Sequence, residues 1–532
     1  MNKIRNRQSA APQSTTAAPR KASKRFGALK PCVARWATYI VGFAALFLFL
    51  TWGYGDVLAR AEQESYISAS ADTMHGLLRL PMGGIYWVGR WALLVYKWVW
   101  SGALCMAAVY TLTAWLADRA MRLSRQWDGI GFVLPVAQLG WIMWRGVNLY
   151  YKNEPSLFII IALAVLAVVA VLALVSWLIT RKQAKAELPA RVQPWGMLAA
   201  LVLCAGATAV ARTAGQNTLL TAKMQLMQWD ADWDGMIAAG RSAKQPTRAV
   251  AAYYAAALEE SDQLLEGQYD IPYDFPKLKL DSLDGNEEYG LFESDCNYHA
   301  GLLNAGYRCA MDKVVMGGPR LFYYKRMAVC ALLMGEKALC RKYLTLIDQM
   351  PLEGAFVEKY WAMLDNPALM KDDAELQHVL LLDPREERFE QNYQQPLFLG
   401  YNIGLNSGTD ATLITSAAAC LYSKDLQSFL ARAQILAQKG ASFPSAMQQA
   451  LAILNVKNHG LLQQFPQVGQ FVPGEISSFY MDAKPYMGKK NRLKLRHELR
   501  ERWLGTYVYY YYTENNDPDQ VVKPKQNQSQ VN

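Results

Sequence analysis

The chain changes character at about residue 214, and this change constrains the fold more than any other feature. Before it lie apolar blocks joined by short basic loops; after it, polarity is mixed and follows a helical period. Residues 1–213 contain 23 Lys and Arg against 8 Asp and Glu, whereas residues 214–532 contain 32 against 37. The basic excess therefore suits a membrane half with cytoplasmic anchors, and we expect no nucleic-acid partner.

Five segments are long and apolar enough to cross a bilayer, whose hydrocarbon core requires roughly 20 helical residues. The third is the weakest, because it contains Pro135, Gln138 and Arg145. The five predicted spans are residues 36–53, 99–117, 130–150, 157–180 and 195–211. Together they predict a membrane domain over residues 36–213, in contact with membrane lipids.

The loop charges support five crossings. The segment before the first span carries nine Lys and Arg, and the loops after the second and fourth spans carry three and four. The alternate loops carry two and one, which fits the positive-inside rule. We therefore predict a bacterial inner-membrane protein with a basic cytoplasmic tail at 1–35 and a periplasmic C-terminal half. The tail's acid-free, Arg- and Ser-rich composition also matches a mitochondrial transit peptide.

Three basic residues lie close to the predicted spans, namely Arg90, Lys97 and Arg145. Arg90 and Lys97 are seven residues apart on one helical face, among several Trp and Tyr residues. This pattern is typical of a membrane interface, where aromatic rings form a belt and long cations reach the headgroups. We predict that all three residues lie at the outer interface; a site for an anionic lipid headgroup is the functional alternative.

From Gln216 onward the apolar residues recur with a helical period, and few segments alternate with period two. Paired helices are predicted at 321–335 with 336–350 and at 411–422 with 425–438, followed by 445–456. The sequence thus predicts an all-α extramembrane domain over residues 216–513. The tail at 514–532 is rich in Asn, Gln, Asp and Pro and is expected to be disordered.

One of these pairs resembles a tetratricopeptide repeat. Its glycine, small residue, large apolar residues and closing proline follow the repeat's order, with the proline one place early: Gly335, Cys340, Leu344, Ile347 and Pro351. The first-helix signature and a strict 34-residue period are absent. The whole chain resembles uncharacterised bacterial polytopic membrane protein families with a C-terminal tetratricopeptide-like domain. The resemblance implies about five transmembrane helices followed by an extramembrane domain of divergent α-hairpins.

Stacked helical hairpins leave a concave surface that other chains occupy, so the resemblance implies binding rather than chemistry. Two aromatic segments interrupt the helical pattern, one within residues 268–288 and one near the C-terminus. The predicted binding residues are Tyr269, Tyr273, Phe275, Tyr509, Tyr510, Tyr511 and Tyr512. We expect an envelope protein or peptide as the partner.

Motifs for catalysis, cofactors or metals are not recognisable in the sequence, and none of these groups is predicted. Cys296 and His299 have metal-ligand spacing but lack the second pair that a zinc site needs. Cys330 and Cys340 lie five residues either side of Gly335, so a disulfide across the turn or two buried thiols would both fit.

The leading functional hypothesis is a membrane-anchored scaffold that presents a helical binding domain in the periplasm. The alternative is a membrane enzyme of lipid-linked glycan transfer or polymerisation. Its acids would come from the first outer loop, which offers Asp56, Glu62, Glu64 and Asp72 but no adjacent pair. A transporter is disfavoured, because spans one, four and five contain almost no polar residues.

Overall fold

The computed structural model describes residues 31–121, 129–180, 195–273, 287–384, 409–487 and 492–514. Within these ranges every regular element is a helix, which confirms the all-α prediction. Most of the predicted tail at 1–35, Phe275, and the predicted 514–532 tail beyond Glu514 lie outside the described residues.

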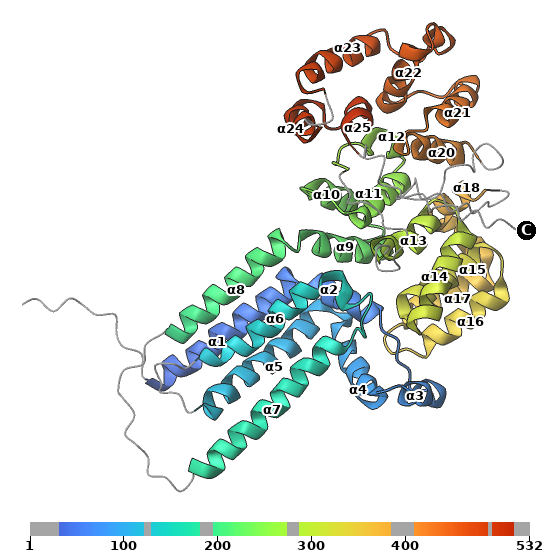
Figure 1. The fold of residues 1–532 in the computed structure, drawn as a ribbon. Coiled ribbons are helices and arrows are strands. Elements are labelled where there is room, and N and C mark those ends of the chain that lie inside the picture. The colour runs from blue at the N-terminus through green and yellow to red at the C-terminus, as the bar shows by residue number, and fades with distance from the viewer. Residues whose placement is uncertain are drawn as a thin grey trace, which may run out of the picture.

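The N-terminal half is a bundle of long, roughly parallel helices (Figure 1). Four helical segments among the described residues are long and apolar enough to cross a membrane: Trp36–Gly53, Val99–Ala120, Ile130–Leu149 and Leu157–Ile179. They are formed by α1 (Pro31–Leu48) with η1 (Phe49–Gly53), α5 (Val99–Ala120), η4 (Ile130–Phe132) with α6 (Val133–Arg145) and η5 (Gly146–Leu149), and α7 (Leu157–Thr180). The outer face of α7 leaves Val168, Val171 and Leu174 exposed, as expected where lipid covers a helix. These helices identify a membrane protein.

The fifth predicted span forms α8 (Trp195–Thr213), a helix of 19 residues. It contacts α1 and α6 and runs alongside them in the bundle (Figure 1). Its composition is richer in Ala and Gly than that of α7, and it is not among the four segments named above.

Residues 54–98, which we call the first outer loop after the side predicted for it, hold three short helices at the end of the bundle that faces the C-terminal half (Figure 1). They are α2 (Gly55–Gln63), α3 (Ala71–Leu78) and α4 (Gly83–Leu93), and η2 (Leu94–Lys97) leads from α4 into α5. The Ser70 side chain caps α3 by accepting from the Thr73 N–H. The α4 helix packs on α7, whereas α2 packs on α5 and on α9 (Gln216–Met227), the first helix of the C-terminal half. The loop therefore lies between the two halves of the protein.

The C-terminal half consists of helices that pack on their neighbours along the chain. Its first part comprises α9 (Gln216–Met227), η6 (Gln228–Asp230), α10 (Trp233–Ser242), α11 (Arg248–Glu260), α12 (Leu264–Gly267), α13 (Glu287–His299), α14 (Leu303–Gly317), α15 (Leu321–Leu333), α16 (Lys337–Asp348), α17 (Gly354–Asp365), η8 (Pro367–Asp372) and α18 (Ala374–Leu382). Its second part comprises α20 (Asp410–Tyr422), α21 (Leu426–Gln438), α22 (Ser445–Lys457), η9 (Leu461–Gln464), α23 (Val472–Ala483), η10 (Lys484–Tyr486), α24 (Arg492–Trp503) and α25 (Tyr507–Thr513). We call residues 216–514 the outer domain.

The helix boundaries of the outer domain follow the local sequence. Gly335 turns the chain between α15 and α16 with φ of 76°, a left-handed conformation that glycine adopts without steric cost. Thr409 and Thr412 form a reciprocal capping box at the start of α20. The Asp425 side chain caps α21 by accepting from the Ser428 N–H. Both predicted helix pairs are therefore present, and Cys340 is a buried free thiol, so no disulfide joins the first pair.

Two hydrophobic clusters form the interior. One runs without interruption from the membrane bundle through α9 and α11 to α20–α25. The other lies within α13–α18, and it includes one residue of the first outer loop, Tyr66. The Tyr66 hydroxyl donates to the Leu346 carbonyl at 2.8 Å, and its ring meets that of Tyr324 edge-on at 5.2 Å. Apolar packing thus joins the two halves directly.

Candidate functional site

Charged residues of α2 and its C-terminal end are buried where the membrane bundle meets the outer domain. Arg60 and Glu64 are both fully enclosed, and buried charges are stable only when they are paired. The Glu64 carboxylate accepts from Arg60 Nη2 at 2.6 Å and from Arg320 Nη1 at 2.7 Å. Arg320 immediately precedes α15, 256 residues along the chain from Glu64. One carboxylate therefore ties the first outer loop to the outer domain.

Arg60 also contacts the outer domain directly. Its guanidinium lies 3.7 Å from the centroid of the Phe322 ring, within the range of a cation–π contact. Its Nε donates to Gln225 Oε1 on α9 at 3.1 Å, and the Tyr150 hydroxyl donates to the same oxygen at 3.1 Å. Three segments that are distant in sequence meet at this amide: the first outer loop, the end of the third span, and α9.

The hydrogen bonds continue from Gln225 into the outer domain. Its Nε2 donates to the Tyr253 hydroxyl at 3.0 Å, and that hydroxyl donates to Asp295 Oδ2 at 2.7 Å. Asp295 also accepts from Arg326 Nε at 3.0 Å and from Gln228 Nε2 at 3.1 Å. From Gln228 the contacts reach His299 and then Glu260. We call this set the buried polar chain: Arg60, Glu64, Gln225, Gln228, Tyr253, Glu260, Asp295, His299, Arg320 and Arg326.

The position of one proton in the buried polar chain follows from its geometry. Gln228 Nε2 donates to Asp295 and to the Gln225 carbonyl, so Gln228 Oε1 faces His299 Nε2 at 3.2 Å. Because an amide oxygen only accepts, His299 Nε2 carries a proton. His299 Nδ1 and Glu260 Oε1 are 2.6 Å apart, and this contact also requires a proton between them. The His299–Glu260 pair therefore holds one proton in addition to that on Nε2.

Burial determines where that proton lies. Removal from water raises the pKa of Glu260 to about 8. The same burial, together with the nearby Arg326 cation, lowers the pKa of His299 to about 4. At neutral pH we therefore place the proton on the Glu260 carboxyl group, which donates to the neutral imidazole.

This assignment predicts a loss of stability at alkaline pH. The pKa of Glu260 in the folded chain, about 8, lies above the usual 4.5, so the free energy of unfolding falls as the pH rises through this interval. We expect the wild-type protein to melt at a lower temperature at pH 9 than at pH 6. In Glu260→Gln, which cannot ionise, this loss should shrink by on the order of a few kcal/mol. Thermal unfolding in nanodiscs at pH 6 and pH 9 measures the stability lost between the two pH values, with the exposed Glu266→Gln as control. An equal loss of stability in all three proteins would contradict the protonation of Glu260.

A second cluster of charges surrounds Glu62. Glu353, just before α17, accepts from Lys325 Nζ at 2.7 Å and from Lys97 Nζ. Glu62 lies near these three groups, and burial raises its pKa to about 7. Within the described part of the chain, its Oε1 atom is buried without a hydrogen-bond partner. A carboxyl group with a pKa in this range can donate or accept a proton near neutral pH.

The three basic residues predicted at the membrane interface all have protein partners. Arg90 donates to both Glu154 oxygens at 2.8 Å and to the Tyr66 carbonyl at 3.0 Å. Lys97 is paired with Glu353, and Arg145 donates to Asn153 Oδ1 at 2.5 Å. The charged ends of Arg90 and Lys97 therefore hold the outer loops and the outer domain together. Arg90 is buried, and Lys97 and Arg145 are half-buried. A position at the membrane interface stays a prediction for all three residues.

The tyrosines predicted to bind a partner lie against one another. The Tyr269 ring is 4.8 Å from that of Tyr510, and the Tyr273 ring is 5.4 Å from that of Tyr422. Tyr509 is also buried, whereas Tyr511 and Tyr512 are half-buried. The two aromatic segments thus pack together as part of the interior and are not a free surface in this conformation. Whether any of them contacts a partner stays untested.

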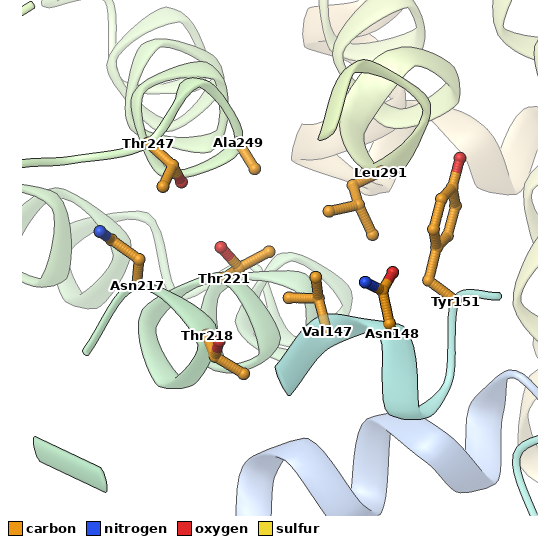
Figure 2. A pocket seen from close by; sticks show the side chains of 9 residues that line it. All are labelled: Val147, Asn148, Tyr151, Asn217, Thr218, Thr221, Thr247, Ala249 and Leu291. Atoms are coloured by element: carbon orange, nitrogen blue, oxygen red, sulfur yellow. The ribbon is translucent and has the colours of Figure 1, made fainter. Parts of the chain in front are cut away.

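A cavity of about 220 Å³ lies beside the buried polar chain, where η5 meets α9, α11 and α13. Figure 2 shows Val147, Thr221 and Leu291 turned toward this space. Its lining residues are Val147, Asn148, Tyr151, Asn217, Thr218, Thr221, Thr247, Ala249 and Leu291. None of them is charged, and the Oδ1 atoms of Asn148 and Asn217 are buried without partners among the described residues. The cavity therefore suits a small neutral molecule with hydrogen-bond donors.

Comparison with known proteins places the chain in a family. One family model, described as a family of unknown function (DUF6057), matches residues 31–214 and, in a second stretch, 146–514. The chain belongs to this family. The two matched stretches together cover the membrane bundle and the outer domain. No curated protein and no solved structure matches the chain.

Proposed function

We propose that this protein is an inner-membrane scaffold that holds a helical binding domain in one orientation on the periplasmic side. The observation that carries the proposal is the Glu64 carboxylate, buried between Arg60 of the membrane half and Arg320 of the outer domain. Buried ion pairs add little net stability, but separating them is costly, and they can specify one arrangement of the groups they join. A domain held in one orientation can present a binding surface at a constant height and angle above the membrane.

The same proposal includes five crossings, with α8 as the fifth. Its packing on α1 and α6 supports this, as does the alternation of basic and poorly charged loops. Alkaline phosphatase is active only when exported, so fusions after residues 155 and 520 should be active and a fusion after residue 187 inactive. An inactive fusion at 520 would contradict the periplasmic placement of the outer domain.

We further propose that the hairpins α15–α16 and α20–α21 are divergent tetratricopeptide-like units. In α16 the residues of the repeat pattern, Cys340, Leu344 and Ile347, are all fully buried, and α16 packs on α15. Gly335 supplies the left-handed turn between the helices. Stacked units of this kind recruit other chains, so the expected partner is an envelope protein or peptide.

An enzyme of lipid-linked glycan transfer remains the second candidate, because Glu62 is buried with a raised pKa beside two lysines. Against it, both Glu64 oxygens are engaged by arginines, and Asp72 is exposed. Crosslinking in intact membranes followed by affinity purification separates the candidates. A defined envelope complex, with normal function of Glu62→Gln in a deletion strain, would support the scaffold. Accumulation of lipid-linked glycan intermediates in the deletion strain and in Glu62→Gln would favour the enzyme.

A further inference from the structure

A second cavity, of about 200 Å³, lies in the outer domain between the C-terminal end of α11, the short helix α12, and α20–α22. Three acidic residues line it, Glu259, Asp262 and Glu266, and the described lining includes no basic residue. Its walls are mainly apolar and include Leu265, Ile414 and Met447. We call it the acidic cavity.

Glu259 is the buried acid of this cavity, with 8% of its surface exposed. Its Oε1 accepts from the Thr415 hydroxyl at 2.6 Å, which fixes the carboxyl group against α20. Its Oε2 is buried and has no hydrogen-bond partner in the described part of the chain. A buried carboxyl oxygen without a partner costs free energy, so a donor or cation that reached this oxygen through the cavity would stabilise it.

The rim of the cavity adds negative charge. Asp262 and Glu266 are exposed, and Asp262 has a φ of 55°, an uncommon backbone conformation for a residue other than glycine. The Asp262 N–H donates to the Glu259 carbonyl at 3.0 Å, so this turn keeps the two acids close together. On the neighbouring helices, Lys439 is paired with Asp410.

We propose that the acidic cavity binds the side chain of a lysine or arginine from the partner protein. The cationic end would meet Glu259, and the methylene groups would lie along Leu265, Ile414 and Met447. Apolar walls favour a cation on an aliphatic stem over a bare ion. A metal ion is disfavoured, because the described residues contain no group of three or more His, Cys, Asp or Glu placed to hold one. This inference rests on the proposed scaffold function and specifies the chemistry of its partner.

Binding should release a proton. Burial raises the pKa of Glu259 to about 8, and the neighbouring acids Glu260 and Asp262 add to the effect. Glu259 also lines a second, small cavity together with Cys296 and His299 of α13. The empty site is therefore mostly protonated at pH 7, and a cation displaces the proton, so affinity for the cation should rise between pH 6 and pH 8.

The experiment uses the full chain in nanodiscs with n-butylguanidinium as the probe and n-butanol as its neutral counterpart. Saturation-transfer NMR should detect the butyl protons of the guanidinium probe, with a signal that increases from pH 6 to pH 8. We expect at least a fivefold weaker signal in Glu259→Gln and in Met447→Trp, which fills the cavity without removing the acid. Glu266→Gln, at the exposed rim, is the matched control and should reduce the signal less.

An unchanged signal in both Glu259→Gln and Met447→Trp, or an equal signal from n-butanol, would overturn the proposal. Circular dichroism checks that each variant is folded, and a misfolded Glu259→Gln leaves Met447→Trp to decide. If the probe does not bind but crosslinking yields a defined envelope complex, the cation site is wrong and the scaffold function is still supported. If the probe does not bind and no defined complex is recovered, the scaffold function is wrong as well.

Discussion

The Glu64→Gln variant is expected to unfold with a free energy about 3–5 kcal/mol lower than that of the wild-type protein, because it leaves buried cations without a counter-charge. Both oxygens of Glu64 are occupied, one by Arg60 at 2.6 Å and one by Arg320 at 2.7 Å. A glutamine amide offers one acceptor and places two donors where a second acceptor is needed. The two guanidinium groups would then repel each other in a site closed to water.

The matched control for Glu64→Gln is a pair of the same type at the surface. Arg241 and Asp270 are at a similar distance, 2.8 Å, but their side chains are 48% and 33% exposed. Asp270→Asn should therefore cost less than about 1 kcal/mol. Denaturant unfolding of the three proteins in nanodiscs measures both effects. A cost for Glu64→Gln as small as that for Asp270→Asn would mean that the junction does not depend on this carboxylate.

The second large effect is expected at Arg326, in the middle of the buried polar chain. Its Nε donates to Asp295 Oδ1 at 3.0 Å, and its guanidinium lies 3.9 Å from the centroid of the Tyr298 ring. Arg326→Met should cost about 3 kcal/mol, because the buried Asp295 carboxylate loses its counter-charge. Breaking a buried ion pair typically costs about 3–5 kcal/mol. We expect the lower end of this range for Arg326→Met, since Tyr253 and Gln228 still donate to Asp295.

A double variant separates the uncompensated charge from the lost packing at this site. Arg326→Met combined with Asp295→Asn removes both charges, so most of the stability lost in Arg326→Met should return. Thermal unfolding of the wild-type, single and double variants forms a complete cycle. A double variant no more stable than Arg326→Met would show that stacking on Tyr298, rather than the ion pair, determines the cost.

Local sequence patterns predicted the helices well. Four of the five apolar segments became helical segments of bilayer length, and the paired helices around Gly335 lie where their period placed them. Both signals depend on neighbours within a few turns, which a single sequence records directly. The fifth segment was harder to assign, because α8 is rich in small residues and its position is determined by packing on α1 and α6.

Long-range pairing explains what the sequence did not reveal. Arg90 and Lys97 stand among Trp and Tyr residues, which is also the pattern of a membrane interface, but their partners Glu154 and Glu353 lie 64 and 256 residues away. In the sequence, the carboxylates of the first outer loop are the candidate catalytic acids of the enzyme alternative. The i,i+4 spacing of Arg60 and Glu64 is a local signal for one partner of this carboxylate, but nothing local in the sequence indicates the other, Arg320.

The terminal tyrosine run shows a second limit of local patterns. Four successive helical residues cannot all face one core, yet Tyr509 and Tyr510 are buried and Tyr511 and Tyr512 are half-buried. The structure surrounds α25 on more than one side: Tyr510 packs on Tyr269 and Tyr422, and Tyr512 packs on Tyr480. Because α25 packs on several sides, every tyrosine of the run is at least half-buried, and that arrangement follows from the tertiary fold alone.

The central claim is that the outer domain is held in one orientation on the membrane bundle through Glu64. Spin labels at two exposed positions, Trp100 on α5 and Ala338 on α16, allow their separation to be measured by pulsed electron paramagnetic resonance in nanodiscs. We predict one narrow distance distribution for the otherwise wild-type protein and a broad or shifted one for Glu64→Gln. A broad distribution in the wild-type protein, or the same narrow one in both proteins, would contradict the claim.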